Sequence, residues 1–271
     1  MAFHTRTRGR FSAVTTETGN DLARVFKEDG FAEVGRLLTA AEIETYREIY
    51  DRFLSGAIES GDKRSDLGSH VGGRDGGREN ITQIMWPSAL HPALREMPLH
   101  RRALETAREL IGQDAVLDFD MLIHKDPYSG VATPWHQDMA YWVDLPDTRA
   151  VSIWIALDDA TVDNGCMWYV RGSHELPLRP HRPTSDGRNI ECDCSETEPG
   201  ATPVPLPAGH GVAHAGGTLH SSRGNTTARA RRAYILNYRP AAMVDLERAQ
   251  GADHGLNENI RKIRNSTATT P

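Results

Sequence analysis

The chain has 271 residues, a formal net charge of −6 and only three cysteines. A chain of this length can bury a substantial core as one domain, and its acidic balance argues against nucleic acid as a partner. No apolar run approaches the length of a membrane-spanning helix and no hydrophobic signal peptide opens the chain, so we expect a cytoplasmic protein without membrane contact or disulfide framework.

The N-terminal part is predicted to be helical around one strand. Residues 1–20 are polar and irregular, which indicates a flexible arm, and residues 21–271 are assigned to a single domain. A helix is expected from Asp21 until Gly30 stops it, and residues 31–38 have the composition of a strand.

Two further helical regions are expected before the middle of the chain. Residues 39–58 form an amphipathic helix, in which Thr39 and Glu42 have the spacing of a capping box. The second region covers residues 91–112.

A glycine-rich, charged stretch over residues 60–80 separates these two regions and lacks periodicity. Such a stretch is either a passive loop or a functional cover, and both alternatives stay open. As a cover, the segment Leu67–Arg78 would order on substrate binding, and Arg74 or Arg78 would meet an anionic group.

The chain from residue 115 onward is rich in β-branched and aromatic residues between turn signals. Strands are expected over 115–126, 150–159, 166–174, 211–220 and 231–240. The predicted fold is mainly β with flanking helices, built on a double-stranded β-helix (jelly roll, cupin-like) core. Residues 179–205 have the composition of an insertion, and a short helix is expected after Pro240.

The most informative motif is Trp135-His136-Gln137-Asp138. Residues two apart on an extended strand point to the same side, so His136 and Asp138 can bind one metal ion. Two histidines and one carboxylate form the facial triad of iron(II) oxygenases, which leaves the opposite coordination positions open. From the residues alone, the third ligand is His210, His214 or His220.

Four segments, in this order, resemble the phytanoyl-CoA dioxygenase family of iron(II)/2-oxoglutarate oxygenases, which includes ectoine hydroxylase-like enzymes. The resemblance spans roughly residues 21–240. The segments cover residues 26–43, 122–138, 151–174 and 206–238.

The resemblance assigns the site residues. His220, followed by Ser222, Asn225 and a downstream arginine, matches the distal histidine, so His136, Asp138 and His220 are the expected catalytic metal ligands. By its spacing from His220, Arg231 matches the arginine that binds the distal carboxylate of 2-oxoglutarate, and Ser222 matches its hydroxyl partner. A planar guanidinium suits a carboxylate, and the adjacent Arg232 is expected to face the other way.

Three assignments beside the metal are less defined. Trp154 resembles an aromatic residue next to the metal pocket, although a plain core role is also open. Lys125 either faces the pocket as a cofactor-binding residue or closes a strand, and Asn225 is expected to close a turn. An aromatic wall for a partly apolar substrate is expected from Trp86, Met139, Tyr141, Trp142 and Trp168.

The resemblance implies an enzyme of specialised metabolism that uses Fe(II), 2-oxoglutarate and O2 to hydroxylate, desaturate or cyclise a small molecule. Succinate and CO2 are the expected co-products. Asp138 favours these outcomes over halogenation, because halogenating relatives lack that carboxylate. The alternatives are a non-oxidative cupin-like isomerase or lyase, which would not need Arg231 and Ser222, and a catalytically silent metal-binding module. The protein is expected to be a monomer or homodimer.

Overall fold

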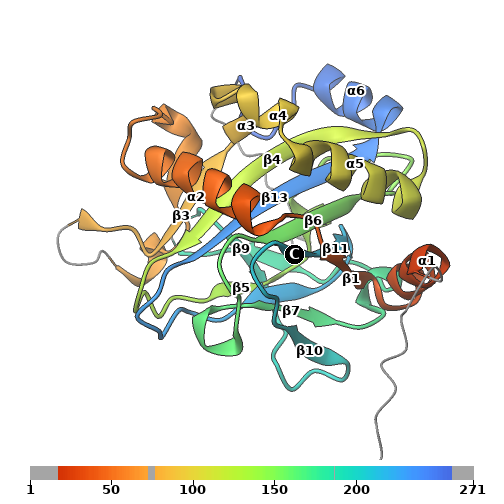
Figure 1. The fold of residues 1–271 in the computed structure, drawn as a ribbon. Coiled ribbons are helices and arrows are strands. Elements are labelled where there is room, and N and C mark those ends of the chain that lie inside the picture. The colour runs from red at the N-terminus through yellow and green to blue at the C-terminus, as the bar shows by residue number, and fades with distance from the viewer. Residues whose placement is uncertain (1–17, 73–76, 186, 258–271) are drawn as a thin grey trace, which may run out of the picture.

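The structure is a computed structural model that describes residues 18–72, 77–185 and 187–257. Two antiparallel sheets face each other, and helices lie along the outer face of the larger sheet (Figure 1). The larger sheet has the order β1 (Phe31–Arg36), β11 (His210–Ala215), β6 (Val151–Ala156), β13 (Arg231–Pro240), β4 (Ala115–Lys125), β3 (Ile81–Met85) and β2 (Arg64–Asp66). The smaller has the order β10 (Ala201–Val204), β7 (Met167–Val170), β12 (His220–Ser222) and β5 (Thr133–His136).

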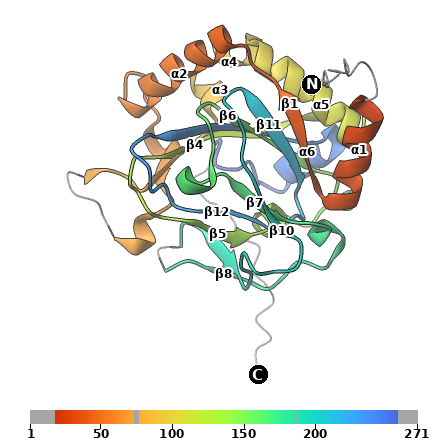
Figure 2. The same ribbon diagram turned by 60° about the horizontal axis from the view of Figure 1, so that its bottom comes forward.

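The jelly-roll prediction is therefore confirmed. Figure 2 shows the helices on one side of the molecule and the strands of the smaller sheet on the other. The helices are α1 (Thr18–Asp29), α2 (Ala40–Leu54), α3 (Pro87–Leu90), α4 (Ala93–Glu96), α5 (Pro98–Ile111) and α6 (Ala241–Ala249), and a separate hairpin joins β8 (His181–Pro183) to β9 (Ile190–Cys192).

Strand β13 shows how the sequence positions the two sides of the large sheet. Side chains alternate along a strand, so Tyr234 and Leu236 pack in the core beneath the helices, whereas Ala233 and Ile235 pack in the core between the sheets. Arg231 lies two residues before Ala233 on this strand, so its side chain is on the same side as those of Ala233 and Ile235. The same alternation therefore directs Arg231 into the space between the sheets.

The predicted helices differ from the observed ones at their ends. The capping box of α2 is present, with Thr39 and Glu42 in the expected roles, but the helix ends at Leu54 rather than residue 58, because the chain turns at Ser55 and Gly56. The region 91–112 is two helices rather than one, because Pro98 has no N–H to donate and starts a new helix after Met97.

Three predictions about a strand, a loop and an insertion also change. Residues 211–220 do not form one strand, because Gly216 and Gly217 turn the chain from β11 in the large sheet to β12 in the small sheet. Part of the 60–80 stretch forms β2, which pairs with the unforeseen β3. The predicted insertion over 179–205 supplies β8, β9 and β10, and β10 is an edge strand of the small sheet.

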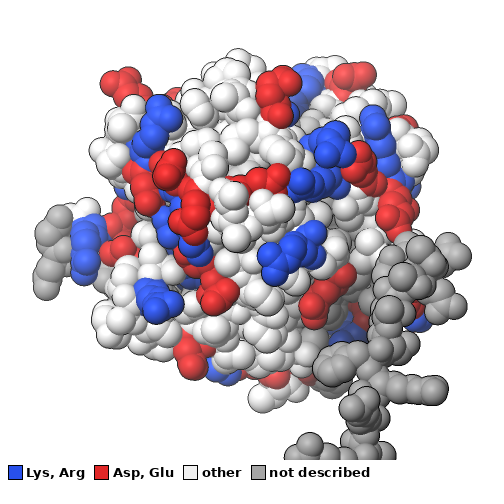
Figure 3. Space-filling model, in the orientation of Figure 1, with Lys and Arg blue, Asp and Glu red and all other residues white. Residues whose placement is uncertain are grey.

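The visible surface carries no one-signed charge patch. Acidic and basic side chains are interspersed on the face of Figure 3, where α2 and α5 lie. Among the described residues, no helix combines the length and apolar character needed to cross a membrane.

We predict that buried His124 makes the fold sensitive to acid. Burial lowers the pKa of His124 to about 4, against about 6.5 in an unfolded chain. The unfolded state therefore binds a proton between these values that the folded state does not, and stability falls as the pH drops below about 6.5. Between pH 7 and pH 5 the wild type should lose about 2 kcal/mol more stability than His124→Gln. Urea denaturation at both pH values measures this, and an equal loss in the two proteins would contradict it.

Candidate metal centre and its cavity

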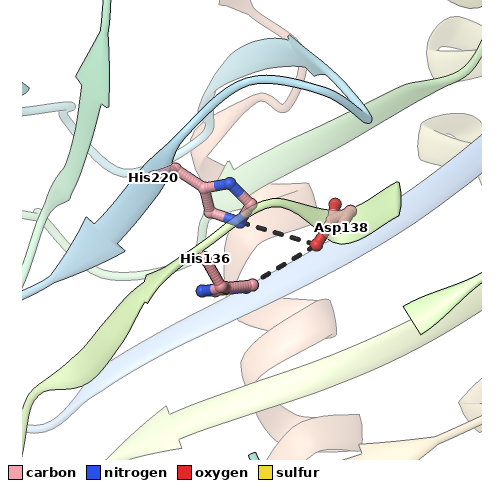
Figure 4. A group of neighbouring side chains, drawn as sticks. All are labelled: His136, Asp138 and His220. Atoms are coloured by element: carbon pink, nitrogen blue, oxygen red, sulfur yellow. Dashed lines mark ion pairs between the residues drawn. The ribbon is translucent and has the colours of Figure 1, made fainter. Parts of the chain in front are cut away.

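The small sheet brings the predicted ligands together. His136 ends β5, and its Cα partner across the ladder is His220 at the start of β12. Gln137 is extended (φ −123°, ψ 128°), so Asp138 points to the same side as His136. Figure 4 shows the three side chains converging on one point.

The separations within this cluster suit a metal ion. Asp138 Oδ1 lies 3.7 Å from His136 Nε2 and 3.5 Å from His220 Nε2. One ligand atom from each residue lies within 4.8 Å of the others. The geometry is therefore what a two-histidine, one-carboxylate ligand set needs.

Backbone carbonyls fix the orientation of both imidazoles. His136 Nδ1 lies 2.8 Å from the carbonyl oxygen of Pro134, and His220 Nδ1 lies 2.9 Å from that of Thr218. A carbonyl only accepts hydrogen bonds, so each Nδ1 carries the hydrogen and each Nε2 keeps a lone pair. These lone pairs face the shared point beside Asp138, as metal-binding histidines require.

The protonation states also favour metal binding. Burial lowers the pKa of both His136 and His220, which keeps the imidazoles neutral. Burial by itself would raise the pKa of Asp138, but the surrounding histidines, His220 foremost, bring it below its usual range. Two neutral imidazoles and one carboxylate are the forms that bind a metal ion.

The second oxygen of Asp138 is held by residues that the sequence interpretation did not assign to this role. Asp138 Oδ2 accepts from Ser152 Oγ at 3.0 Å and lies 3.3 Å from His214 Nε2. His214 Nδ1 in turn lies 3.2 Å from the Tyr169 hydroxyl. His214 thus lies beside the ligand cluster but contacts the carboxylate oxygen that faces away from it. Ser152 lies two residues before Trp154 on the same strand, so strand alternation could have placed its side chain on the side of the metal pocket. No sequence pattern could have paired Tyr169 with His214.

Gln137 ties the motif to the rest of the fold. Its side chain points opposite to its two neighbours and is buried, donating to the carbonyl of Gly217 at 2.7 Å and accepting from the backbone N–H of Arg179 at 2.9 Å. These contacts connect the ligand segment to the turn before β12. Gln137 therefore fixes the backbone that carries both neighbouring ligands.

A cavity of about 150 Å³ opens from the cluster into the space between the sheets. It is lined by His136, Asp138, His220 and His214, and also by Trp154, Ser222 and Arg231. The Arg231 guanidinium lies over the Trp154 ring, with Cζ 5.3 Å from the ring centre. The structure thus brings Arg231, Ser222 and Trp154 to the cavity that contains the three predicted ligands.

Arg231 is a buried cation whose guanidinium hydrogen bonds are incomplete in the described part of the chain. Its side chain is 1% exposed, and its Nε and Nη1 have no hydrogen-bond partner in the described part of the chain. Burial lowers its pKa to about 10, so it remains charged at neutral pH. A buried charge without a partner is costly, and a carboxylate entering the cavity would satisfy it.

Arg232 faces the other side, as predicted. Its Nε donates to Asp158 Oδ2 at 2.9 Å, and its Nη1 donates to Asp51 of α2 at 2.7 Å. Its charge is therefore already compensated outside the cavity.

Lys125 takes the second of the two roles considered for it. Its Nζ is buried and donates to the carbonyl oxygens of Val131, Ser222 and Arg223 at 3.1, 3.2 and 2.5 Å. These three bonds use every hydrogen of the ammonium group, and Lys125 does not line the cavity. Lys125 is therefore placed to close its strand and not to bind a cofactor in the cavity. Asn225 closes its turn as predicted, donating to the carbonyls of Lys125, Asp126 and Arg229.

Only some of the residues that were predicted to contact the substrate line the cavity. Of the five residues expected to form an aromatic wall, Tyr141 and Trp142 line the cavity, whereas Trp86, Met139 and Trp168 do not. Met85, Phe119, Met121 and Ile123 supply further apolar lining. His210 lies on β11 away from the cavity, where it pairs with Arg36.

The glycine-rich segment reaches the same cavity. Leu67 lines it, and the carbonyl of Leu67 accepts from Asn189 Nδ2, which lines it as well. Arg78 lies 3.5 Å from Asp126, whereas residues 73–76, which include Arg74, fall outside the described residues. The expected role of this segment as a cover thus stays a prediction.

The jelly roll and the facial cluster define a cupin-type metalloprotein architecture. A sequence model of the family "Phytanoyl-CoA dioxygenase (PhyH)" matches residues 26–233. The chain belongs to this family.

Individual relatives agree with this assignment. "Phytanoyl-CoA dioxygenase domain-containing protein 1" of Bos taurus is 32% identical over 161 residues, which cover 57% of this chain and 55% of the bovine protein. The chain spans about half the length of the curated relatives it matches. Among solved structures, EvdO2 from Micromonospora carbonacea var. aurantiaca complexed with 2-oxoglutarate is 27% identical with a TM-score of 0.67, covering 85% of this chain and 92% of that one. The 2-oxoglutarate-dependent epimerase SnoN from nogalamycin biosynthesis is 26% identical with a TM-score of 0.66, covering 82% and 83%.

Proposed function

We propose that the protein is an iron(II)- and 2-oxoglutarate-dependent oxygenase that acts on a small molecule. The observation that carries the proposal is Arg231, a buried cation in the cavity of the ligand cluster whose Nε and Nη1 have no hydrogen-bond partner among the described residues. A non-oxidative cupin-like isomerase or lyase would need the metal ligands but would not need an arginine that binds 2-oxoglutarate. A silent metal-binding module would not need such an arginine either.

The residues present fit both groups. His136, Asp138 and His220 would hold the iron, and Arg231 with Ser222 would hold the distal carboxylate of 2-oxoglutarate. When bound, iron, 2-oxoglutarate and O2 supply the oxidising power, with succinate and CO2 as co-products.

The protein's own contribution is placement and protection. Ser152 and His214 hold one oxygen of Asp138, which leaves the other directed at the metal position. Trp154 covers one face of the Arg231 guanidinium and limits the access of water to that charge. The apolar lining beyond the cluster suits a partly apolar substrate.

The reaction type belongs to the same proposal. Asp138 supplies a carboxylate ligand, which supports hydroxylation, desaturation or ring closure rather than halogenation. Similar solved proteins include a carbocyclase and an epimerase from nogalamycin biosynthesis, which supports a role in specialised metabolism. A cytoplasmic location and a monomeric or homodimeric state are predictions from the sequence; the three free cysteines support the location.

Co-substrate turnover tests the proposal. Purified protein with iron(II) should form succinate slowly from 2-oxoglutarate in the presence of O2 even without the true substrate, and zinc(II) should not replace iron(II). The matched control is Asp138→Ala, which should be inactive under the same conditions. Metal binding in the wild type without succinate formation would favour the non-oxidative alternative.

A further inference from the structure

The far wall of the cavity comes from the segment that follows α6. Glu247 on α6 and Ala252, Asp253 and His254 beyond it line the same cavity as the metal cluster. His254 is the best-anchored of these residues. Its ring centre lies 4.3 Å from that of Phe119, and its carbonyl accepts from Trp86 Nε1 at 3.2 Å.

His254 is also held through one nitrogen by two carboxylates. His254 Nε2 lies 3.0 Å from Glu247 Oε2 and 3.2 Å from Asp118 Oδ2. Its backbone adopts a left-handed conformation (φ 52°), which is uncommon for a residue other than glycine. These contacts hold the residue in that conformation against the cavity.

His254, Asp118 and Glu247 have the composition of a metal site, but the surrounding charges argue against one. Arg239 Nη1 lies 3.1 Å from Glu247 and 3.4 Å from Asp118. Arg248 Nη1 lies 2.8 Å from Glu247, and its Nη2 contacts Asp118. Both carboxylates already accept from guanidinium groups, and the two permanent positive charges would repel a divalent cation placed among them.

The carboxylates of Asp118 and Glu247 determine the protonation state of His254. A nitrogen between two carboxylates must carry a hydrogen, so Nε2 is a donor. Burial lowers the pKa of His254, but the hydrogen bonds and charges of Asp118 and Glu247 more than offset this and raise it. The ring is therefore favoured as an imidazolium, in which Nδ1 carries a hydrogen as well.

That second hydrogen has no protein acceptor within the described ranges, where no hydrogen bond involves His254 Nδ1. The neighbouring carboxylate of Asp253 already accepts hydrogen bonds from the backbone N–H groups of Gly255, Leu256 and Asn257. Among the described lining residues, Arg231 and His254 carry the positive charge, one at the co-substrate position and one on the far wall.

We propose that His254 is a substrate-binding residue that donates its Nδ1 hydrogen to a carboxylate on a substrate with an apolar body. Phe119, Met85 and Trp142, which line the cavity, would contact the apolar body. This inference rests on the proposed function, in which the other cation, Arg231, is occupied by 2-oxoglutarate. It restricts the substrate class to organic acids and places the anion away from the metal.

The test compares 3-phenylpropanoate with 3-phenylpropan-1-amine, which share an apolar body and differ in the sign of their charge. Calorimetric titrations use protein loaded without O2 with iron(II) and saturating 2-oxoglutarate, so that Arg231 is occupied. At pH 6 the wild type should bind the carboxylate at least about tenfold more tightly than the amine, as expected for a hydrogen bond to a charged group. Raising the pH to 9 should weaken carboxylate binding as the imidazolium loses its proton.

Two variants separate this role from a structural one. His254→Phe keeps a ring against Phe119 and should lose the preference for the carboxylate. His254→Gln can donate a hydrogen bond but does not ionise, so its carboxylate affinity should not change between pH 6 and pH 9. His91→Gln, at the end of α3 and outside the cavity lining, is the matched control and should behave as the wild type.

One set of results would contradict the role of His254, and a different result would contradict the proposed function. Equal binding of the two probes, or an unchanged preference in folded His254→Phe, would overturn the role of His254 while 2-oxoglutarate still binds normally. Failure of the wild type to bind 2-oxoglutarate would instead refute the proposed function.

Discussion

Alanine at His136, Asp138 or His220 is expected to abolish iron binding and succinate formation together. Each residue supplies one of three protein bonds to the metal, and the three ligand atoms lie within 4.8 Å of one another. Loss of a residue that merely orients a ligand typically weakens metal binding 10–100-fold, so loss of a ligand itself should cost more than about 100-fold. Equilibrium titration with iron(II) without O2 measures the change.

His214→Ala is the matched control for this set. His214 is also a buried histidine of the same cavity, but it contacts Asp138 Oδ2, the oxygen turned away from the other ligands. Its removal should weaken iron binding by no more than roughly 10–100-fold and leave a loaded site at high iron concentration. If His214→Ala strips the metal and His220→Ala does not, the ligand assignment is wrong.

Arg231→Ala is expected to weaken 2-oxoglutarate binding by at least about tenfold while iron affinity changes little. A hydrogen bond to a charged group contributes roughly 1.5–3 kcal/mol, and about 1.4 kcal/mol corresponds to tenfold in affinity. Arg231→Lys should recover only part of the loss, because a single ammonium group does not reproduce the paired donors of a guanidinium. Calorimetric titration of the iron-loaded protein without O2 gives both affinities.

The neighbouring Arg232 provides the control for charge. Arg232→Ala removes the same charge one residue away, but on the opposite side of β13, where it pairs with Asp158 and Asp51. It should leave 2-oxoglutarate affinity unchanged and lower stability by about 1 kcal/mol. Similar 2-oxoglutarate affinities for wild type and Arg231→Ala would remove the main support for this co-substrate.

Features that depend on one strand or one helix were predictable from the sequence. The two-residue spacing of His136 and Asp138 places them on one side, and the adjacency of Arg231 and Arg232 separates them, because side chains alternate along any strand. The capping box of α2 was similarly local, since Thr39 and Glu42 are three residues apart.

Features that depend on how distant segments pack were not predictable in this way. Asp138 meets Ser152 and His214 only because β6 and β11 are neighbours in the large sheet. The His254 network joins Asp118 on β4 to Arg239 on β13 and Glu247 on α6, which follow β4 by more than a hundred residues of chain. The strand predicted over residues 211–220 failed for a related reason: its hydrophobic pattern does not reveal that the chain changes sheets at Gly216.

Iron and 2-oxoglutarate are expected to occupy one site, which is formed by the ligand cluster and Arg231. The most direct measurement is the absorption spectrum of the protein with iron(II), without O2, before and after addition of 2-oxoglutarate. We expect a metal-to-ligand charge-transfer band that requires iron(II) and saturates with 2-oxoglutarate. In Arg231→Ala, saturation should need an at least about tenfold higher concentration of 2-oxoglutarate. Iron binding at His136, Asp138 and His220 with no such band on adding 2-oxoglutarate would contradict it.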